Sequence, residues 1–243
     1  MRVLIWNEGQ HEAQQGSVAA RIYPDGMHGA IAAGLRGHLG PDVDIRTATL
    51  ADPEQGLAAA DLHATDVLLW WGHEAHAAVA DEAVARVITR VNEGMGFLPL
   101  HSAHYSKPFT RLMGTTCSLN WRNDNDRELV WTVNPTHPIA AGVPHPLIIE
   151  GQEMYGEYFD IPAPDELVFV SSFSGGEVLR SGVTFTRGLG RIFYFSPGDQ
   201  EYPVYHHPDV HRVLANGVRW AAPKLPATTI ESPMRERGWF ERK

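Results

Sequence analysis

Residues 67–76 read Val67-Leu68-Leu69-Trp70-Trp71-Gly72-His73-Glu74-Ala75-His76. The first five residues are large and apolar, and a short apolar run closed by glycine predicts a strand that is buried on both faces. Strands of this kind are typical of parallel sheets that helices cover on both sides. Histidines and a glutamate follow at once, so polar chemistry is expected where this strand ends.

The neighbouring segments continue the same pattern. Short apolar runs at 2–7, 43–47 and 97–100 predict further strands, although Pro99 weakens the last one because a central strand needs its amide hydrogen. Helical periodicity predicts helices at 27–39 and 80–93. Strands that alternate with helices through short connections predict an α/β fold with a mostly parallel, open sheet and helices on both faces.

The second half of the chain is less regular, because the alternation fades after about residue 115. Its expected elements are shorter strands or hairpins, a late strand entering the core and a closing helix. They lie at 128–133, 147–150, 167–173, 182–186, 191–195 and 208–221. No internal repeat or domain boundary is visible, so we expect one domain over residues 1–222 and a loosely packed, Pro- and charge-rich C-terminal tail over 223–243.

Composition excludes several classes of function. The chain has 243 residues, 43% hydrophobic and 20% charged, with a formal net charge of −9 that disfavours a nucleic-acid partner. The N-terminal apolar run is too short for a signal peptide, and no stretch reaches membrane-spanning length. Cys117 is the single cysteine, so no intrachain disulfide can form. Cytoplasmic localisation without membrane association is the expectation.

Polar side chains follow four of the predicted strands, and in an open parallel sheet ligands bind beyond the carboxyl ends of the strands. These residues are Asn7, Glu8, His11 and Glu12; His73, Glu74 and His76; His101, Ser102 and His104; and Ser196, Asp199, Glu201, Tyr205, His206 and His207. Because separate segments bring imidazoles and carboxylates to one edge of the sheet, we expect a ligand site there.

A divalent metal is one candidate ligand, with zinc favoured because it binds neutral imidazole and carboxylate from distant segments. The pairs His73/His76 and His101/His104 are spaced three apart, which puts both members on one face of a helical turn. No His-Glu-x-x-His signature is present. For each single histidine, a hydrogen-bonded structural role is the common alternative.

Two kinds of covalent or proton-transfer chemistry remain open. Ser102 has the strand-to-loop position of a nucleophile but lacks the flanking glycines of a nucleophile elbow, so a polar ligand contact is favoured. Glu150, Glu153 and Glu157 lie among aromatic and apolar residues, where carboxylates can move protons; exposed turn positions are the alternative.

The tryptophans at 70, 71 and 121 are candidates for stacking on sugars, with core packing the safer assignment for the first two. No dinucleotide or Walker loop is present, so no nucleotide cofactor is expected.

Several short motifs together resemble the ThuA-like (trehalose utilisation) family of the class I glutamine amidotransferase-like superfamily. They are Trp70-Trp71-Gly72-His73, Leu100-His101-Ser102, Leu112-Met113-Gly114-Thr115-Thr116-Cys117, His137-Pro138-Ile139, Glu153-Met154-Tyr155-Gly156-Glu157, Phe193-Tyr194-Phe195-Ser196-Pro197-Gly198 and Tyr205-His206-His207-Pro208. The resemblance implies a flavodoxin-like fold and a role in the breakdown of trehalose or related disaccharides, beside a sugar dehydrogenase that makes 3-keto sugars. Glutamine hydrolysis is disfavoured, because His101-Ser102-Ala103 carries no cysteine at the elbow. Asp199 stands where wider members often carry histidine.

The resemblance and the residues together predict an enzyme that acts on a disaccharide or its 3-keto derivative, by isomerisation or hydrolysis and with metal assistance. A non-catalytic sugar-binding or regulatory subunit on the same fold is the alternative, and a hydrolase using Ser102 is a third hypothesis. Expected partners are a small-molecule sugar, a sugar dehydrogenase of the same pathway and a second copy of the chain. The predicted residues are catalytic His101, Glu153, Tyr155 and Asp199; substrate-binding His11, Trp71, Ser102, Glu157 and His206; and metal-binding His73, His104 and His207.

Overall fold

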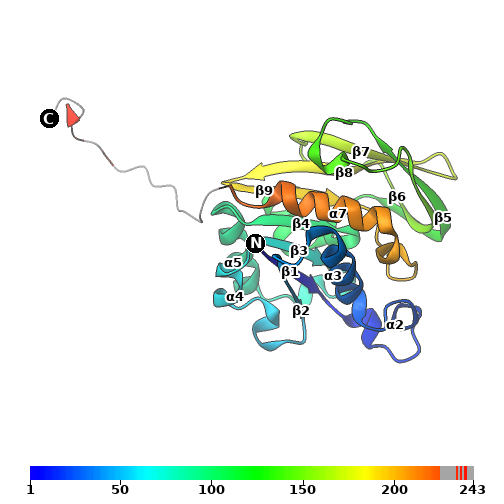
Figure 1. Ribbon diagram of the computed structural model, residues 1–243, viewed down its shortest axis with the longest axis horizontal. Coiled ribbons are helices and arrows are strands. Elements are labelled where there is room, and N and C mark those ends of the chain that lie inside the picture. The colour runs from blue at the N-terminus through cyan, green and yellow to red at the C-terminus, as the bar shows by residue number, and fades with distance from the viewer. Residues whose placement is uncertain (225–233, 235, 237, 240–243) are drawn as a thin grey trace.

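The computed structural model describes residues 1–224, 234, 236, 238 and 239 of the chain. Within this part of the chain, nine strands form one mixed sheet in the order β2-β1-β3-β4-β9-β8-β7-β5-β6 (Figure 1). The strands are β1 (Arg2–Asn7), β2 (Asp44–Thr49), β3 (Val67–Trp71), β4 (Gly96–Leu100), β5 (Asn120–Thr132), β6 (Leu147–Gly156), β7 (Glu166–Phe173), β8 (Val178–Arg187) and β9 (Gly190–Phe195).

Helices cover both faces of the half of the sheet that contains β1 to β4. On one face, α3 (Gly26–Leu39) and α7 (Pro208–Ala221) pack side by side (Figure 1). The opposite face is covered by α4 (Ala59–His63), α5 (Asp81–Asn92) and α6 (Lys107–Met113). The remaining short elements are α1 (Gln10–Ala13), α2 (Val18–Ile22), η1 (Pro53–Gly56), η2 (His76–Ala78), η3 (His101–Tyr105), η4 (Pro138–Ala140) and η5 (Val204–His206).

Strand β3 shows why its sequence is apolar throughout. Val67, Leu69 and Trp71 point into the cluster beneath α3 and α7, whereas Leu68 and Trp70 point into the cluster beneath α4 and α5. Because side chains alternate across a strand, a strand covered on both faces needs apolar residues at every position. The predicted strands and helices of residues 1–100 are confirmed, and two short helices, α1 and α2, lie between the first predicted strand and the first predicted helix.

Pro99 is accommodated inside a central strand, since β4 lies between β3 and β9. The pairs between β4 and β9 are Phe97 with Ile192 and Leu100 with Phe195, one on each side of the proline. The strand prediction is therefore correct despite the missing amide hydrogen.

The sheet is half parallel and half antiparallel, which corrects the expectation of a mostly parallel sheet. Pairs among β2, β1, β3, β4 and β9 are parallel, and those among β9, β8, β7, β5 and β6 are antiparallel. The reason lies in the connections, because a parallel crossover needs a dozen or more residues. The links from β7 to β8, over 174–177, and from β8 to β9, over 188–189, are too short and form hairpins instead.

The predicted strands and closing helix of the second half are all present, several of them longer than expected. Most of the predicted tail, residues 225–233, 235, 237 and 240–243, lies outside the described residues, so the division at residue 222 stays a prediction. No helix in the described part of the chain is both long enough and apolar enough to cross a membrane.

Candidate functional site

Three neighbouring strand ends and one antiparallel strand bring four side chains together. His73 follows β3, His101 follows β4, Asp199 follows β9, and Glu153 comes from β6. One nitrogen or oxygen atom from each residue lies within 4.8 Å of the corresponding atoms of the other three. The prediction that polar residues meet at the carboxyl edge of the parallel strands is confirmed for this group.

His101 is the buried centre of the group, with no exposed surface. Its Nδ1–H donates to the backbone carbonyl of Ser196 at 2.8 Å, and its Nε2 lies 3.0 Å from Oε2 of Glu153. The same Nε2 lies 3.5 Å from Oδ2 of Asp199, an ion-pair contact without hydrogen-bond geometry. Both ring nitrogens therefore face acceptors, which is the environment that an imidazolium ion needs.

The charges of the group are coupled. Burial lowers the pKa of His101, but the close contacts and negative charges of Asp199 and Glu153 outweigh burial and raise the pKa to about 9. Burial raises the pKa of Asp199, yet the close contact and positive charge of His101 hold it below its usual range. One buried cation thus lies between two carboxylates, and the group can accept a further positive charge.

Aromatic residues hold His101 in place. The ring of Tyr155 stacks on the imidazole with centroids 4.4 Å apart and planes 5° from parallel. The Tyr194 hydroxyl donates to the His101 carbonyl at 3.0 Å. Burial raises the pKa of Tyr155 well above its ordinary value, so its hydroxyl keeps its proton and can donate it in a hydrogen bond.

The loop that carries His73 is held in place by Glu8, the residue that follows β1. The Glu8 carboxylate accepts hydrogen bonds from the backbone N–H groups of Glu74 and Ala75 at 2.8 and 2.9 Å. The His73 ring lies 5.3 Å from the His11 ring and 6.2 Å from the Trp71 ring. Burial lowers the pKa of His73, and the nearby His101 lowers it further, so His73 is a neutral imidazole.

Several buried polar atoms around this loop have no hydrogen-bond partner within the described part of the chain. They include His11 Nε2, His73 Nδ1 and Asp199 Oδ2. Buried polar atoms are normally satisfied, and when they are not, an ion or water is a common reason. These atoms are consistent with a site that receives a ligand.

The approach to Asp199 depends on the glycine before it. Gly198 has a φ of +147°, a conformation that L side chains rarely adopt, and a Cβ atom here would lie 2.0 Å from the Tyr205 hydroxyl oxygen. The Gly198 carbonyl accepts a hydrogen bond from Trp71 Nε1 at 2.9 Å. Trp71, predicted to bind substrate, is 1% exposed and instead anchors this turn.

A cavity of about 230 Å³ opens beside the group. Its lining residues are His73, Ser102, His104, Tyr105, Trp121, Glu153 and Tyr155. The predicted catalytic pair Glu153 and Tyr155 therefore faces a space that a small ligand can enter.

Ser102 lines the cavity, and within the described residues its hydroxyl forms no hydrogen bond with a histidine. Its hydroxyl donates to the Gly72 carbonyl at 2.9 Å, and both ring nitrogens of His101 are engaged elsewhere. His104 also lines the cavity, and its Nδ1–H donates to the Cys117 carbonyl at 2.6 Å. Burial lowers the pKa of His104 to about 3, so this ring is neutral.

Three further predicted residues form other contacts, outside both the group and the cavity lining. The Glu157 carboxylate accepts hydrogen bonds from Arg180 at 2.8 and 2.9 Å and from the Phe159 N–H group. Burial raises the pKa of Glu157, but these bonds outweigh burial and lower the pKa below its ordinary value. His207 is the N-cap of α7, where Nδ1 accepts from the Asp209 N–H. His206 stacks on Tyr23 with centroids 5.0 Å apart.

The predicted set of metal ligands needs revision. Of His73, His104 and His207, only His73 belongs to the group of potential ligands found in the described residues. His104 is turned toward a backbone carbonyl and His207 caps a helix, because a histidine's identity does not fix the direction of its ring. The other members of that group, His101, Glu153 and Asp199, are residues predicted to be catalytic.

Some contributors were not assigned from the sequence. The Ser196 carbonyl acts through the backbone, which no side-chain pattern reveals. Glu8 was expected at the edge of the sheet and Trp121 was a stacking candidate, whereas Tyr105 was not singled out, because nothing local distinguishes it from a surface residue.

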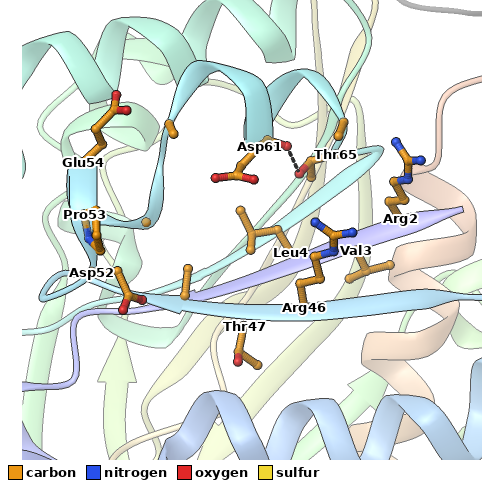
Figure 2. Close-up of a pocket in the computed structure, with 14 residues that line it drawn as sticks. Arg2, Val3, Leu4, Arg46, Thr47, Asp52, Pro53, Glu54, Asp61 and Thr65 are labelled. Atoms are coloured by element: carbon orange, nitrogen blue, oxygen red, sulfur yellow. Dashed lines mark hydrogen bonds between the residues drawn. The ribbon is translucent and has the colours of Figure 1, made fainter.

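A second cavity, of about 430 Å³, lies between the first half of β1, β2, η1 and α4 (Figure 2). Its lining includes Arg2, Arg46, Asp52, Glu54 and Asp61, together with small and apolar residues. The charges are mixed, and Arg46 is already paired with Asp44 at 3.1 Å. No histidine or cysteine lines this cavity, so it offers no comparable set of ligands or proton-transfer groups.

Fold and site define an α/β protein with a histidine–carboxylate group at the carboxyl edge of its parallel strands. The sequence matches the ThuA family, described as trehalose utilisation, over residues 2–221. The chain therefore belongs to the ThuA family.

Solved structures with the same fold include a ThuA-like protein from Bacteroides uniformis, with 15% identity, a TM-score of 0.64 and 91% of each chain covered. A ThuA-like protein from Parabacteroides merdae has 16% identity and a TM-score of 0.61, covering 94% of this chain and 92% of the other. A cytoplasmic protein from Salmonella typhimurium has 16% identity and a TM-score of 0.57, with 92% and 100% covered. No curated protein matches the sequence.

Proposed function

We propose that this protein is an enzyme of carbohydrate breakdown that acts on a disaccharide or its 3-keto derivative. The observation that supports the proposal is the buried His101, Glu153 and Asp199 group, which opens through Glu153 and Tyr155 onto a cavity lined by hydroxyl, imidazole and carboxylate groups. Sites with a few convergent polar groups in a concave pocket are typical of small-molecule enzymes.

We propose further that His73, His101 and Asp199 hold a divalent metal, with zinc favoured. Binding of the ion would displace the proton from Nε2 of His101, because an imidazole nitrogen binds a metal only in its deprotonated form. Two histidines and one carboxylate form a common ligand set of catalytic zinc, which binds about 2.0–2.2 Å from nitrogen or oxygen and so separates neighbouring tetrahedral ligands by about 3.3–3.6 Å. His101 Nε2 and Asp199 Oδ2 are 3.5 Å apart, and among the described residues neither Asp199 Oδ2 nor His73 Nδ1, both buried, has a hydrogen-bond partner. These residues fit the ion.

The Ser196 contact supports the same assignment. Histidines that bind metal usually donate their other N–H to a backbone carbonyl or carboxylate, which fixes the ring. His101 Nδ1–H does this at 2.8 Å, which leaves Nε2 directed at the carboxylates. A bound ion would polarise a ketone or hydroxyl pair of the sugar.

Glu153 is then the residue that moves protons, because it lines the cavity while Asp199 does not. Its carboxylate removes a proton from the carbon beside the ketone, and the neutral Tyr155 hydroxyl donates a hydrogen bond to a sugar oxygen. Returning the proton to a neighbouring atom isomerises the sugar. Delivering the proton to the glycosidic oxygen as its carbon–oxygen bond breaks, followed by addition of water, hydrolyses the sugar.

The strand order supports a flavodoxin-like, glutamine amidotransferase-like placement of the fold. The parallel strands run β2-β1-β3-β4-β9, which is the flavodoxin-like order with β9 in the fifth place. Glutaminase activity is not part of the proposal, because the elbow position is occupied by His101-Ser102-Ala103.

The Salmonella typhimurium relative, described as cytoplasmic, supports a cytoplasmic location for this chain as well.

The remaining partners are proposals from the family resemblance. They are a sugar dehydrogenase of the same pathway, which would supply the keto sugar, and a second copy of this chain. The net charge of −9 supports the expectation that nucleic acid is not a partner.

Metal analysis combined with turnover tests the proposal. Purified protein should carry about one divalent ion per chain and convert 3-ketotrehalose, while Asp199→Ala should lose the ion. Glu153→Gln should keep the ion and lose activity by about 10²- to 10⁴-fold. His207→Ala, which changes a histidine outside the group, is the matched control and should keep both.

Two results would contradict the proposal. Normal turnover by Glu153→Gln would remove its catalytic role, and equal metal content in Asp199→Ala and the control would remove the metal site. Tight binding of trehalose or 3-ketotrehalose without any product would favour a sugar-binding or regulatory subunit instead.

A further inference from the structure

The mouth of the site cavity is flanked by two exposed aromatic rings. Trp121 is 66% exposed and Tyr105 is 43% exposed, yet both line the same cavity as Glu153 and Tyr155. Large aromatic side chains left open to water at the rim of a polar pocket are a signature of binding surfaces.

Trp121 is directly connected to the chemistry. Its Cα is paired with that of Tyr155 across β5 and β6, and directly opposed residues of an antiparallel pair project to the same face. Tyr155 in turn stacks on His101 at 4.4 Å. A ring lying on Trp121 would therefore be next to a ring held between Tyr155 and Glu153.

The size of the cavity limits what it can hold. Its volume is about 230 Å³. Pockets that enclose a drug-sized ligand measure about 300–1,000 Å³. A disaccharide approaches such a ligand in size, so this cavity suits one sugar ring and leaves the second ring at the mouth.

We propose that Trp121 is the platform for the second, non-reacting ring of a disaccharide, with Tyr105 as a second aromatic residue of the same cavity lining, and that this contact selects disaccharides over monosaccharides. This inference rests on the proposed function, because it takes the reacting ring to lie in the cavity. The apolar C–H face of a sugar ring lies against an aromatic face, and Trp offers the largest such face. In the described part of the chain, no hydrogen bond or ring contact occupies the Trp121 ring.

Calorimetric titration of the full chain with trehalose and with glucose tests the inference. Trp121→Ala should weaken trehalose binding by about tenfold or more and leave glucose binding within about twofold. Trp121→Phe, which keeps an aromatic face, should recover most of the loss. Trp131→Ala is the matched control, because Trp131 lies on the same strand, is 37% exposed and does not line the cavity.

Fluorescence supplies a readout that a merely structural role would not change. Trehalose should protect the tryptophan emission from acrylamide quenching, glucose should not, and the protection should vanish in Trp121→Phe. Unchanged trehalose affinity in Trp121→Ala, or an equal loss for both sugars, overturns the platform alone. If the wild-type chain binds neither sugar, the proposed function fails, and the platform fails with it.

Discussion

His101 shows how a fully buried side chain can carry a charge. An isolated imidazolium would be costly to bury, but here Glu153 and Asp199 lie 3.0 and 3.5 Å from the same nitrogen. The neighbouring ring nitrogen donates to the Ser196 carbonyl. The charge depends on three partners contributed by β6 and by the residues that follow β9, so it exists only in the folded chain.

Ser102 differs from His101 although it is its immediate neighbour. Its hydroxyl donates to the Gly72 carbonyl and has no imidazole to activate it. We expect Ser102→Ala to lose about 1 kcal/mol of stability, the value of one hydrogen bond. Turnover of 3-ketotrehalose should stay within about threefold of the wild type, since no catalytic base is removed. A loss of several orders of magnitude, with unchanged circular dichroism, would instead establish Ser102 as a nucleophile.

Glu128 is a buried carboxyl whose titration should be visible in stability. Its Oε1 accepts from the Ser171 hydroxyl at 2.5 Å, and burial raises its pKa from 4.5 to about 7, against that hydrogen bond and the charge of His101. The folded state therefore holds a proton that the unfolded state releases between pH 4.5 and 7. This contribution to stability is complete below pH 4.5 and is lost as the pH rises through 7.

Glu128→Gln keeps a neutral side chain at every pH and should remove that loss. Relative to the wild type, the variant should gain about 3 kcal/mol of unfolding free energy between pH 4.5 and 9. Urea unfolding at a series of pH values measures the difference. Glu82→Gln, which changes an exposed carboxyl on α5, is the control and should follow the wild-type pH profile. Parallel profiles for Glu128→Gln and the wild type would contradict the buried titration.

At the level of elements, the turn that leaves β9 determines where Asp199 lies. Gly198→Ala should be destabilised by about 2 kcal/mol or more, because the added Cβ would overlap the Tyr205 hydroxyl at 2.0 Å and the backbone φ is +147°. Asp199 should shift with the turn, so metal content should fall as well. Gly37→Ala, in open space on α3, is the matched control and should be neutral or slightly stabilising in urea unfolding. Equal stabilities of the two variants would show that the turn adapts freely.

The helices and strands also show which structural features can be predicted from the sequence. Strand β3 and helices α3 and α5 could be predicted from local sequence patterns. The core covers both faces of β3 and one face of each helix, so their apolar residues recur with the period of a buried strand or of a helix. Strand β6 was predicted only over 147–150, yet it continues to Gly156. Its last residues include Gln152 and Glu153, which are buried although they are polar, so the apolar alternation that marks a strand is absent there.

The sequence predicted where in the fold the site lies, but it predicted less well which side chains contact one another there. The convergence of His73, His101 and Asp199 follows from the rule that parallel strands end at one edge. The exclusion of His207 does not follow, because its role as a helix cap depends on ring direction. The antiparallel half of the sheet, which supplies Glu153 and Trp121, also depends on pairing between distant segments that no local pattern encodes.

For the molecule as a whole, the parallel half cannot be complete without the end of the chain. β9 pairs with β4, and α7 covers the face that contains Leu98 and Leu100. We expect residues 1–114 expressed alone to lack a cooperative unfolding transition and to bind hydrophobic dyes, because the edge of β4 and one core cluster stay uncovered. Residues 1–222 should unfold cooperatively at a midpoint close to that of the full chain, and this comparison also tests the predicted tail. A cooperative transition in the 1–114 chain would show that the parallel half folds independently.

The place of β9 between β4 and β8 has a consequence for how the protein is made. The ribosome delivers β1 to β4 early, but the strand that joins them to the antiparallel half emerges only after residue 190, and α7 later still. Until then, the nascent chain carries two unfinished sheets with open edges, which are the surfaces that chaperones bind. Closure of the sheet, and with it the placement of Asp199, can therefore occur only after β1 to β8 have all been synthesised.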